Sequence, residues 1–174
     1  MDKSQQRKIC LNGRNAMDPE ERKRCSRIIC EKLKAISEGK RILSYCPIGS
    51  ETDISSFNDR HDVAYPVTAE DGEMEAYLPI GGHFILNEWR IREPDPSFSK
   101  KIDPKDLDLI IVPCVGFDEK RRRLGHGKGY YDRFLRRTDA LRVGVAFEVQ
   151  KLETVCTEEH DLPLDLIITE KNTY

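Results

Sequence analysis

The sequence predicts an α/β sandwich in which helices cover a mostly parallel sheet. Segments with a strand pattern alternate with segments of helical pattern along most of the chain, which is the order that a parallel sheet requires. Residues 107–113, LDLIIVP, form one continuous apolar strand pattern, as expected in the middle of a parallel sheet covered on both faces. With 174 residues, no internal repeat and no linker, the chain fits a single domain over residues 1–174.

Two helices are predicted at the start of the chain. The first covers residues 2–15 and has a basic face. The second begins at Asp18, which can accept from free helical N–H groups, with Pro19 in the first helical position and Glu21 where a capping box places its acid. Gly39 is suited to end it. Its apolar stripe at helical spacing is Cys25, Ile28, Ile29, Leu33 and Ile36.

Strand patterns follow at residues 41–46, 62–67 and 75–80, with a turn expected at Asp71-Gly72. We expect residues 81–106 to be irregular, because three prolines interrupt them. The remaining patterns predict the strand at 107–113, a polar Gly-rich loop at 116–129, a helix over about 130–138, a strand at 141–147, a short helix-like segment and a last strand at 164–169.

The balance of charge excludes two broad classes of protein. Charged residues make up 34% of the chain, but 29 Lys and Arg against 31 Asp and Glu leave a net charge of −2. Intrinsic disorder requires a higher net charge and fewer large apolar residues. A general nucleic-acid binder would show a basic excess, so we expect no nucleic-acid partner.

The cysteines and the N-terminus predict a cytoplasmic protein. The six cysteines show no C-x-x-C spacing, and the opening MDKSQQRK is polar, without the apolar stretch of a signal peptide. We therefore expect free thiols in a reducing compartment. No apolar run approaches the roughly 20 residues that span a bilayer, so no membrane contact is expected.

The segment RLGHGKGYYDRFL, residues 123–135, carries the strongest chemical signal. Gly125, Gly127 and Gly129 alternate, which lets the backbone approach a ligand closely, and Lys128 adds a positive charge. The predicted helix begins at the same place, which favours a phosphate group. Asp132 is placed to hold Mg²⁺ against that phosphate. The spacing alone also fits a flexible turn with a solvated lysine.

The complete string resembles the signature of the 5-formyltetrahydrofolate cyclo-ligase family, also called 5,10-methenyltetrahydrofolate synthetases. Other segments are similar too, and the similarity extends over nearly the whole chain. They are Lys3-x-x-x-Arg7 with the helix start at 17–22, RILSYCPIGSETD at 41–53 and VPCVGFD at 112–118.

This resemblance implies a fold, a reaction and partners. The fold is a three-layer α/β/α sandwich similar to those of sugar-phosphate isomerases and CoA transferases. The reaction uses ATP and Mg²⁺ to close 5-formyltetrahydrofolate into 5,10-methenyltetrahydrofolate, with release of ADP and phosphate. Phosphorylation of the formyl oxygen is followed by attack from N10. The partners are these two small molecules, and a monomer is expected.

The resemblance also implies roles for individual residues. Lys128 and Arg123 are the expected catalytic cations, and Asp132 and Asp161 the expected metal ligands. The expected ATP-binding residues are Lys3, Arg7, Arg123, Leu124, Gly125, His126, Gly127, Lys128, Gly129, Tyr130 and Tyr131. The expected substrate-binding residues are Cys46, Glu51, His126, Gly127, Lys128, Gly129 and Tyr130.

Several residues have a second reading. Glu51 follows a strand end, where α/β sheets bind ligands, but it is also placed to cap a following short helix. Trp89 fits either stacking on the pterin or capping the core. One of Tyr130 and Tyr131 is expected in the core and the other at the ligand. His61, His83 and His160 are expected to be ordinary histidines.

Two residues depart from the family pattern, and two other functions compete. His126 stands where relatives often have Arg or Tyr, and Arg121 where they often have Gly; Lys120, Arg121 and Arg122 are expected to be solvated. The competing functions are a same-fold enzyme acting on a sugar phosphate or CoA ester, and a non-catalytic folate- or nucleotide-binding module.

Overall fold

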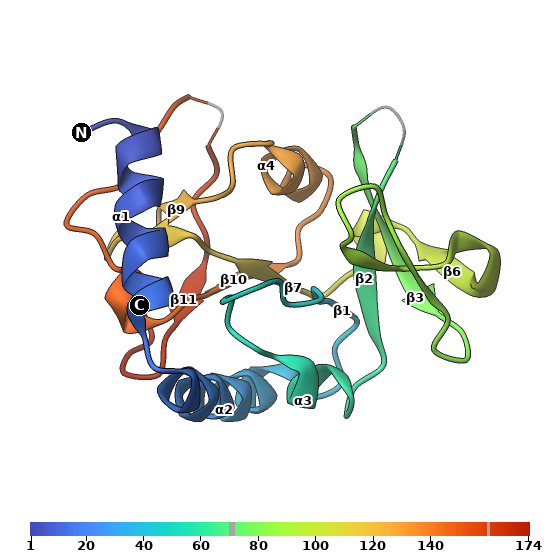
Figure 1. Cartoon of the computed structure of the whole chain (residues 1–174). Helices are drawn as coiled ribbons and strands as arrows, with labels where there is room; N and C mark the ends of the chain where they lie inside the picture. Colours follow the sequence, from blue (N-terminus) through green and yellow to red (C-terminus); the bar gives the residue numbers. More distant parts are fainter. Residues whose placement is uncertain (70–71, 160) are drawn as a thin grey trace.

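The structure is a computed structural model that describes residues 1–69, 72–159 and 161–174 (Figure 1). The turn expected at Asp71 and the histidine at 160 lie outside the described residues. The α-helices are α1 (Lys3–Ala16), α2 (Pro19–Ser37), α3 (Ser55–Asn58) and α4 (Tyr130–Leu135). The 3₁₀ helices are η1 (Pro96–Phe98), η2 (Pro104–Asp106) and η3 (Glu148–Gln150).

A seven-stranded sheet in the order β11-β10-β7-β1-β2-β3-β6 forms the centre of the described chain. Its five consecutive strands from β11 to β2 are parallel, and β3 and β6 add antiparallel pairs at one edge. The predicted α/β fold with a mostly parallel sheet is therefore confirmed. The strands of this sheet are β1 (Ile42–Leu43), β2 (Val63–Thr68), β3 (Met74–Pro79), β6 (Ser99–Ile102), β7 (Leu109–Pro113), β10 (Leu141–Val145) and β11 (Leu166–Ile168).

Two hydrophobic clusters cover opposite faces of the parallel strands. Because side chains alternate along a strand, Leu109 and Ile111 of β7 join the cluster under α2 and α3, whereas Ile110 and Val112 join the cluster with Phe134 of α4. Figure 1 shows α2 and α3 on one side of the sheet and α4 on the other. The continuous apolar run of β7 therefore reflects burial on both faces, as the sequence predicts.

The prediction that residues 81–106 are irregular is wrong. It contains the hairpin of β4 (Phe84–Leu86) and β5 (Arg92–Pro94), followed by η1, β6 and η2. Its prolines end a strand or begin a helical turn, positions where a missing N–H costs little. The Asp95 side chain accepts from the N–H of Ser97, and Asp103 accepts from Lys105.

The predicted Gly-rich loop also contains a short hairpin, in which β8 (Gly116–Phe117) pairs with β9 (Arg123–Leu124). Arg121 lies in its turn at a φ of 60°, a left-handed conformation that favours Gly. Arg122 is not merely solvated, because it pairs with the buried Asp118 at 2.6 Å. The hairpin thus fixes the start of the segment 123–129.

Candidate active site

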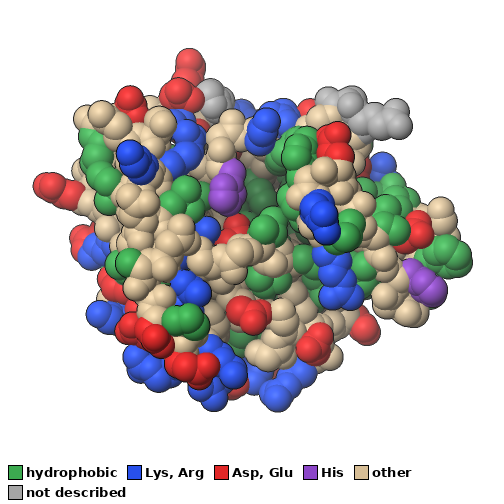
Figure 2. Space-filling model, viewed as in Figure 1, with side chains coloured by type: hydrophobic (Ala, Val, Ile, Leu, Met, Phe, Trp, Pro, Cys, Tyr) green, Lys and Arg blue, Asp and Glu red, His purple; other side chains and the backbone are tan. Residues whose placement is uncertain are grey.

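A cavity of about 900 Å³ opens at the carboxyl ends of the parallel strands. Cys46 after β1, Pro113 at the end of β7 and Thr68 at the end of β2 all line it. The chain passes from β1 to β2 on one side and later adds β7 on the other, so the cavity lies where the strand order reverses. Open α/β sheets place their ligands at this point. Figure 2 shows the hollow, with hydrophobic side chains inside it and basic side chains near its rim.

All fifteen residues predicted for the site line this one cavity. From α1 come Lys3 and Arg7; from the segment after β1, Cys46 and Glu51; and from the C-terminal segment, Asp161. The others are the consecutive residues Arg123, Leu124, Gly125, His126, Gly127, Lys128, Gly129, Tyr130, Tyr131 and Asp132.

The segment 125–129, here called the glycine loop, packs against two arginines. A Cβ atom on Gly127 would lie 3.1 Å from the Arg7 guanidinium, and one on Gly125 would lie 3.0 Å from that of Arg123. Gly127 has a φ of 96° and Gly129, which begins α4, a φ of 70°. The positive φ values of Gly127 and Gly129 favour glycine, and the missing Cβ atoms of Gly125 and Gly127 let the two guanidinium groups lie close to the loop backbone.

The cations of α1 are held on the loop and on the C-terminal segment. The Arg7 Nε–H donates to the Gly125 carbonyl over 2.8 Å. Lys3 Nζ lies 2.6 Å from Asp161 Oδ2 and 2.9 Å from Glu158 Oε2. Burial alone would lower the pKa of Lys3, but the two carboxylates raise it above its ordinary value. Lys3 is thus firmly charged at neutral pH.

Arg123 is a largely buried cation of the cavity wall. Its side chain is 6% exposed, and its Nη2 lies 3.0 Å from Asp132 Oδ2. Its guanidinium also lies 5.5 Å from the ring centre of Tyr131. Its Nε is buried without a hydrogen-bond partner among the described residues. An unsatisfied buried donor is costly, so this site favours an added acceptor.

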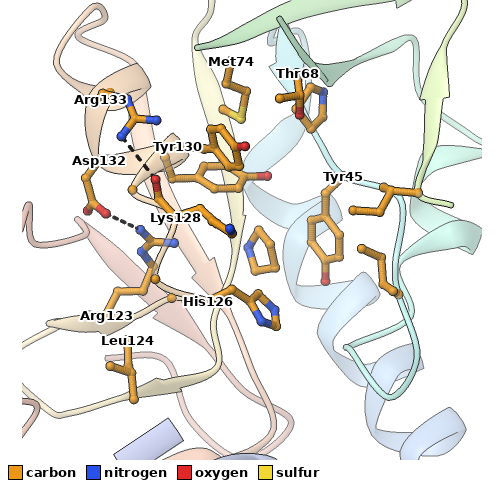
Figure 3. A pocket seen from close by; sticks show the side chains of 18 of the residues that line it. Tyr45, Thr68, Met74, Arg123, Leu124, His126, Lys128, Tyr130, Asp132 and Arg133 are labelled. Atoms are coloured by element: carbon orange, nitrogen blue, oxygen red, sulfur yellow. Dashed lines mark hydrogen bonds and ion pairs between the residues drawn. The ribbon is translucent and has the colours of Figure 1, made fainter. Parts of the chain in front are cut away.

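Lys128 has no ion pair or side-chain hydrogen bond with any residue in the described ranges. Figure 3 shows its amine extending from the loop into the cavity, toward the side on which Tyr45 lies. The loop beneath it is fixed, because Arg133 of α4 donates to the Lys128 carbonyl over 3.2 Å and to the Gly72 carbonyl over 2.9 Å. The backbone of Lys128 is therefore held in place, while its charged amine has no partner among the described residues and can bind a ligand.

Glu51 is a buried carboxylate that faces the cavity. Its side chain is 6% exposed; Oε2 accepts from the Ile48 N–H over 3.0 Å, and Oε1 lies 3.2 Å from His126 Nε2. The reading in which Glu51 caps the next helix is wrong, because the Asp53 side chain accepts from the N–H of Ser55 in the first turn of α3. One oxygen of Glu51 thus closes its own loop and the other remains directed at His126.

Tyrosines and a thiol form the wall between these charged groups. Burial raises the pKa of Tyr45, whose hydroxyl donates to the Thr52 carbonyl, and also that of Tyr131. Burial likewise raises the pKa of the Cys46 thiol to about 11. Tyr130 and Tyr131 both line the cavity and both pack on the second hydrophobic cluster, so the expected division between core and ligand is not observed. This wall is neutral at physiological pH.

Sequence reasoning missed part of the cavity. Trp89 and Arg92 of the β4–β5 hairpin line it, and the hairpin itself was not predicted. Trp89 is 50% exposed, so the reading in which it caps the core is wrong. Further lining residues that were not predicted for the site are Tyr45, Thr68, Met74, Glu93 and Arg133.

The carboxylates of the cavity suit a metal that a bound phosphate would complete. In the described part of the chain, no group of three or more His, Cys, Asp or Glu side chains forms a metal site by itself. Mg²⁺ is commonly held by one or two carboxylates together with substrate phosphates. Asp132 and Asp161 both line the cavity, so two carboxylates of the kind that Mg²⁺ uses are present in its wall. His61 stacks on Phe57 and His83 on Phe98, as ordinary side chains.

None of the helices in the described ranges has the length and apolar character needed to cross a membrane. The six cysteines are free thiols, as the sequence predicts.

Comparison with known proteins gives one consistent result. The model of the 5-formyltetrahydrofolate cyclo-ligase family matches residues 1–170. The chain is 30% identical over 183 residues to a 5-formyltetrahydrofolate cyclo-ligase of Mycoplasma pneumoniae, covering 98% of this chain and all of that one. It is 34% identical over 110 residues to the Escherichia coli enzyme of the same name, covering 62% of this chain and 60% of the relative. The NMR structure of Aquifex aeolicus 5,10-methenyltetrahydrofolate synthetase matches it with a TM-score of 0.88 at 35% identity, over 99% of this chain and 92% of that one.

Proposed function

This chain belongs to the 5-formyltetrahydrofolate cyclo-ligase family and is a ligase acting on folate, and we propose that it uses ATP to activate the formyl oxygen of its substrate in the cavity described above. The products are 5,10-methenyltetrahydrofolate, ADP and phosphate. The family match sets aside a sugar phosphate or a CoA ester as the substrate.

The chemistry sets what the cavity must supply. The N5-formyl group is an amide, and its oxygen is a poor leaving group. Transfer of the γ-phosphoryl group to this oxygen releases ADP and forms an N5 iminium phosphate. N10 then attacks the formyl carbon, the C–O bond breaks to release phosphate, and the N10 proton is lost. The protein therefore needs to position two substrates and stabilise phosphate charge, without a covalent nucleophile.

The glycine loop is the proposed phosphate site, and the available charge of Lys128 on a fixed backbone is the observation that carries this assignment. The guanidinium group of Arg7 lies against the loop backbone at Gly127, and that of Arg123 lies against it at Gly125. In a low-dielectric cavity, such prearranged cations stabilise charge that develops on a transferred phosphoryl group. Lys128 and Arg123 are thus the proposed catalytic residues.

The ion pairs of the ligand-free protein would change partners when nucleotide binds. Lys3 is paired with Asp161, and Arg123 with Asp132. Phosphate oxygens would accept from the two cations, and the carboxylates would then hold Mg²⁺. The metal would supply charge neutralisation on the phosphates. This exchange keeps these two cations and two carboxylates paired in both states, which limits the cost of burying them.

Glu51 is the proposed pterin-binding residue. Its Oε1 faces the cavity beside the neutral wall of Tyr45 and Cys46. A carboxylate accepts two N–H groups of a planar ring in a fixed geometry, whereas apolar walls contact the faces of the ring. His126 of the glycine loop lies within hydrogen-bond distance of the same carboxylate. The proposed phosphate site and the proposed pterin site therefore meet at this pair.

An absorbance assay tests this proposal, because the methenyl product absorbs at a longer wavelength than the substrate. We expect product to form from 5-formyltetrahydrofolate only when ATP and Mg²⁺ are both present, with one ADP released for each product. Binding of both ligands without product formation would instead favour a non-catalytic binding module.

A further inference from the structure

The glycine loop is held at its lysine by a side chain from outside the loop. Gly127 and Gly129, on either side of Lys128, have positive φ values, and glycine reaches many other backbone conformations at little cost. The Lys128 amine does not anchor this segment, because it has no ion pair or hydrogen bond among the described residues. Nη1 of Arg133 in α4 donates to the Lys128 carbonyl over 3.2 Å, as the dashed line in Figure 3 marks.

The same guanidinium contacts the two residues that precede β3. Its Nη2 donates to the Gly72 carbonyl over 2.9 Å, and its Nε lies 3.1 Å from Glu73 Oε1. A guanidinium carries five N–H donors in one rigid plane, so a single arginine can hold several acceptors in a fixed arrangement. Arg133 thereby connects the glycine loop to β3, whose first residue, Met74, lines the same cavity.

Arg133 lies directly against the loop backbone. A Cβ atom on Gly129 would lie 2.9 Å from its Nη1, and its guanidinium carbon lies 5.5 Å from the centre of the Tyr130 ring. The Arg133 side chain is nevertheless 44% exposed, and an ion pair this exposed adds little to the stability of a protein. Its contacts therefore act on the geometry of the loop more than on the stability of the fold.

We infer that Arg133 is a positioning residue that holds the Lys128 backbone so that the amine meets the phosphoryl group in transfer. The inference rests on the proposed function of Lys128. Arg133 acts through the Lys128 carbonyl and touches no reacting group. A displacement of about 1 Å in a reacting group can lower a rate by about 10², so loss of this contact should affect kcat more than binding.

The test compares Arg133→Gln with Arg137→Gln as a matched control. Arg137 follows four positions later and also ties this part of the chain to β3, because it donates to the Met74 carbonyl and pairs with Glu75. Its side chain is 37% exposed, and among the described residues it forms no hydrogen bond or ion pair with the glycine loop. Each variant is measured alone and combined with Lys128→Ala. Amide hydrogen exchange at residues 127–129 reports on the loop without depending on activity.

We expect Arg133→Gln to lower kcat by roughly tenfold to hundredfold, to speed amide exchange at residues 127–129, and to leave Tm and the KM for folate nearly unchanged. In the Lys128→Ala background, Arg133→Gln should lower kcat no further, because the amine that it positions is already absent. Arg137→Gln should change neither kcat nor exchange in the loop.

Three results would overturn the inference: an equal loss of kcat from Arg133→Gln in both backgrounds, the same losses in Arg137→Gln, or unchanged kcat and loop exchange in Arg133→Gln. The last of these would contradict the inference alone and leave the proposed function standing. A wild-type protein that forms no product would instead contradict the proposed function, and the inference with it.

Discussion

Replacing Glu51 with Gln removes a single negative charge from the wall of the cavity while keeping the volume of the side chain. The remaining oxygen can still accept from the Ile48 N–H, which closes the loop after β1. The new NH₂ group then takes the place of Oε1, which lies 3.2 Å from His126. A pterin N–H would meet a donor instead of an acceptor.

The size of the effect follows from the burial of this carboxylate. The side chain is 6% exposed, so water reaches it poorly, and a mismatched buried polar group typically costs about 1–3 kcal/mol. Since about 1.4 kcal/mol corresponds to a factor of ten in affinity, we expect the folate Kd to rise by roughly tenfold or more. ATP affinity and Tm should change little, because the contact with Ile48 is retained.

Calorimetric titration with 5-formyltetrahydrofolate, together with a thermal melt, measures both expectations. Asp53→Ala is the matched control, since it removes a carboxylate from the same segment that instead accepts from the N–H of Ser55 in the first turn of α3. Loss of this hydrogen bond should lower stability by about 1 kcal/mol without changing folate affinity. An unchanged folate Kd in Glu51→Gln would refute the assignment of Glu51 to the substrate.

Three further variants test the rest of the structure. Lys128→Ala should lower kcat by about 10²–10³ with an unchanged melt, and a near-normal kcat/KM for both substrates would remove the glycine loop from the phosphate site. Arg7→Gln should raise the KM for ATP in steady-state kinetics while folate affinity persists; equal loss of both would mean that this contact is structural. Burial alone would raise the pKa of Asp118, but Arg122 and backbone N–H groups lower it below its ordinary value. Asp118→Asn should therefore reduce the free energy of unfolding by about 3 kcal/mol at neutral pH. In urea titrations this difference should begin to shrink below about pH 4, where Asp118 of the unfolded chain takes up a proton, and should disappear as the pH falls through the lowered pKa of the folded protein; a pH-independent difference would contradict the role of its charge.

The sequence was informative wherever a local rule acts. Asp18-Pro19 marks the start of α2 because capping and the fixed φ of proline operate within one turn. The same dipeptide at Asp95-Pro96 and Asp103-Pro104 begins η1 and η2. Those two starts were not recognised, because a single turn shows no apolar periodicity after its cap.

The pairings in the site depend on the order of the strands, which local rules do not determine. Lys3 meets Asp161 from 158 positions away, and His126 meets Glu51 from 75 positions away. The resemblance placed these residues in one site, but not in pairs. Arg92 belongs to no recognised sequence motif. Its position depends on the β4–β5 hairpin, which was not predicted because prolines interrupt this part of the sequence.

Transfer of an oxygen label tests the central claim most directly. The substrate is 5-formyltetrahydrofolate with ¹⁸O in the formyl group, converted in the presence of ATP and Mg²⁺, and the phosphate released is analysed by mass spectrometry. If the formyl oxygen is phosphorylated in the cavity, each molecule of phosphate released carries one ¹⁸O from the substrate. Unlabelled phosphate, with the ¹⁸O recovered in water, would contradict this account.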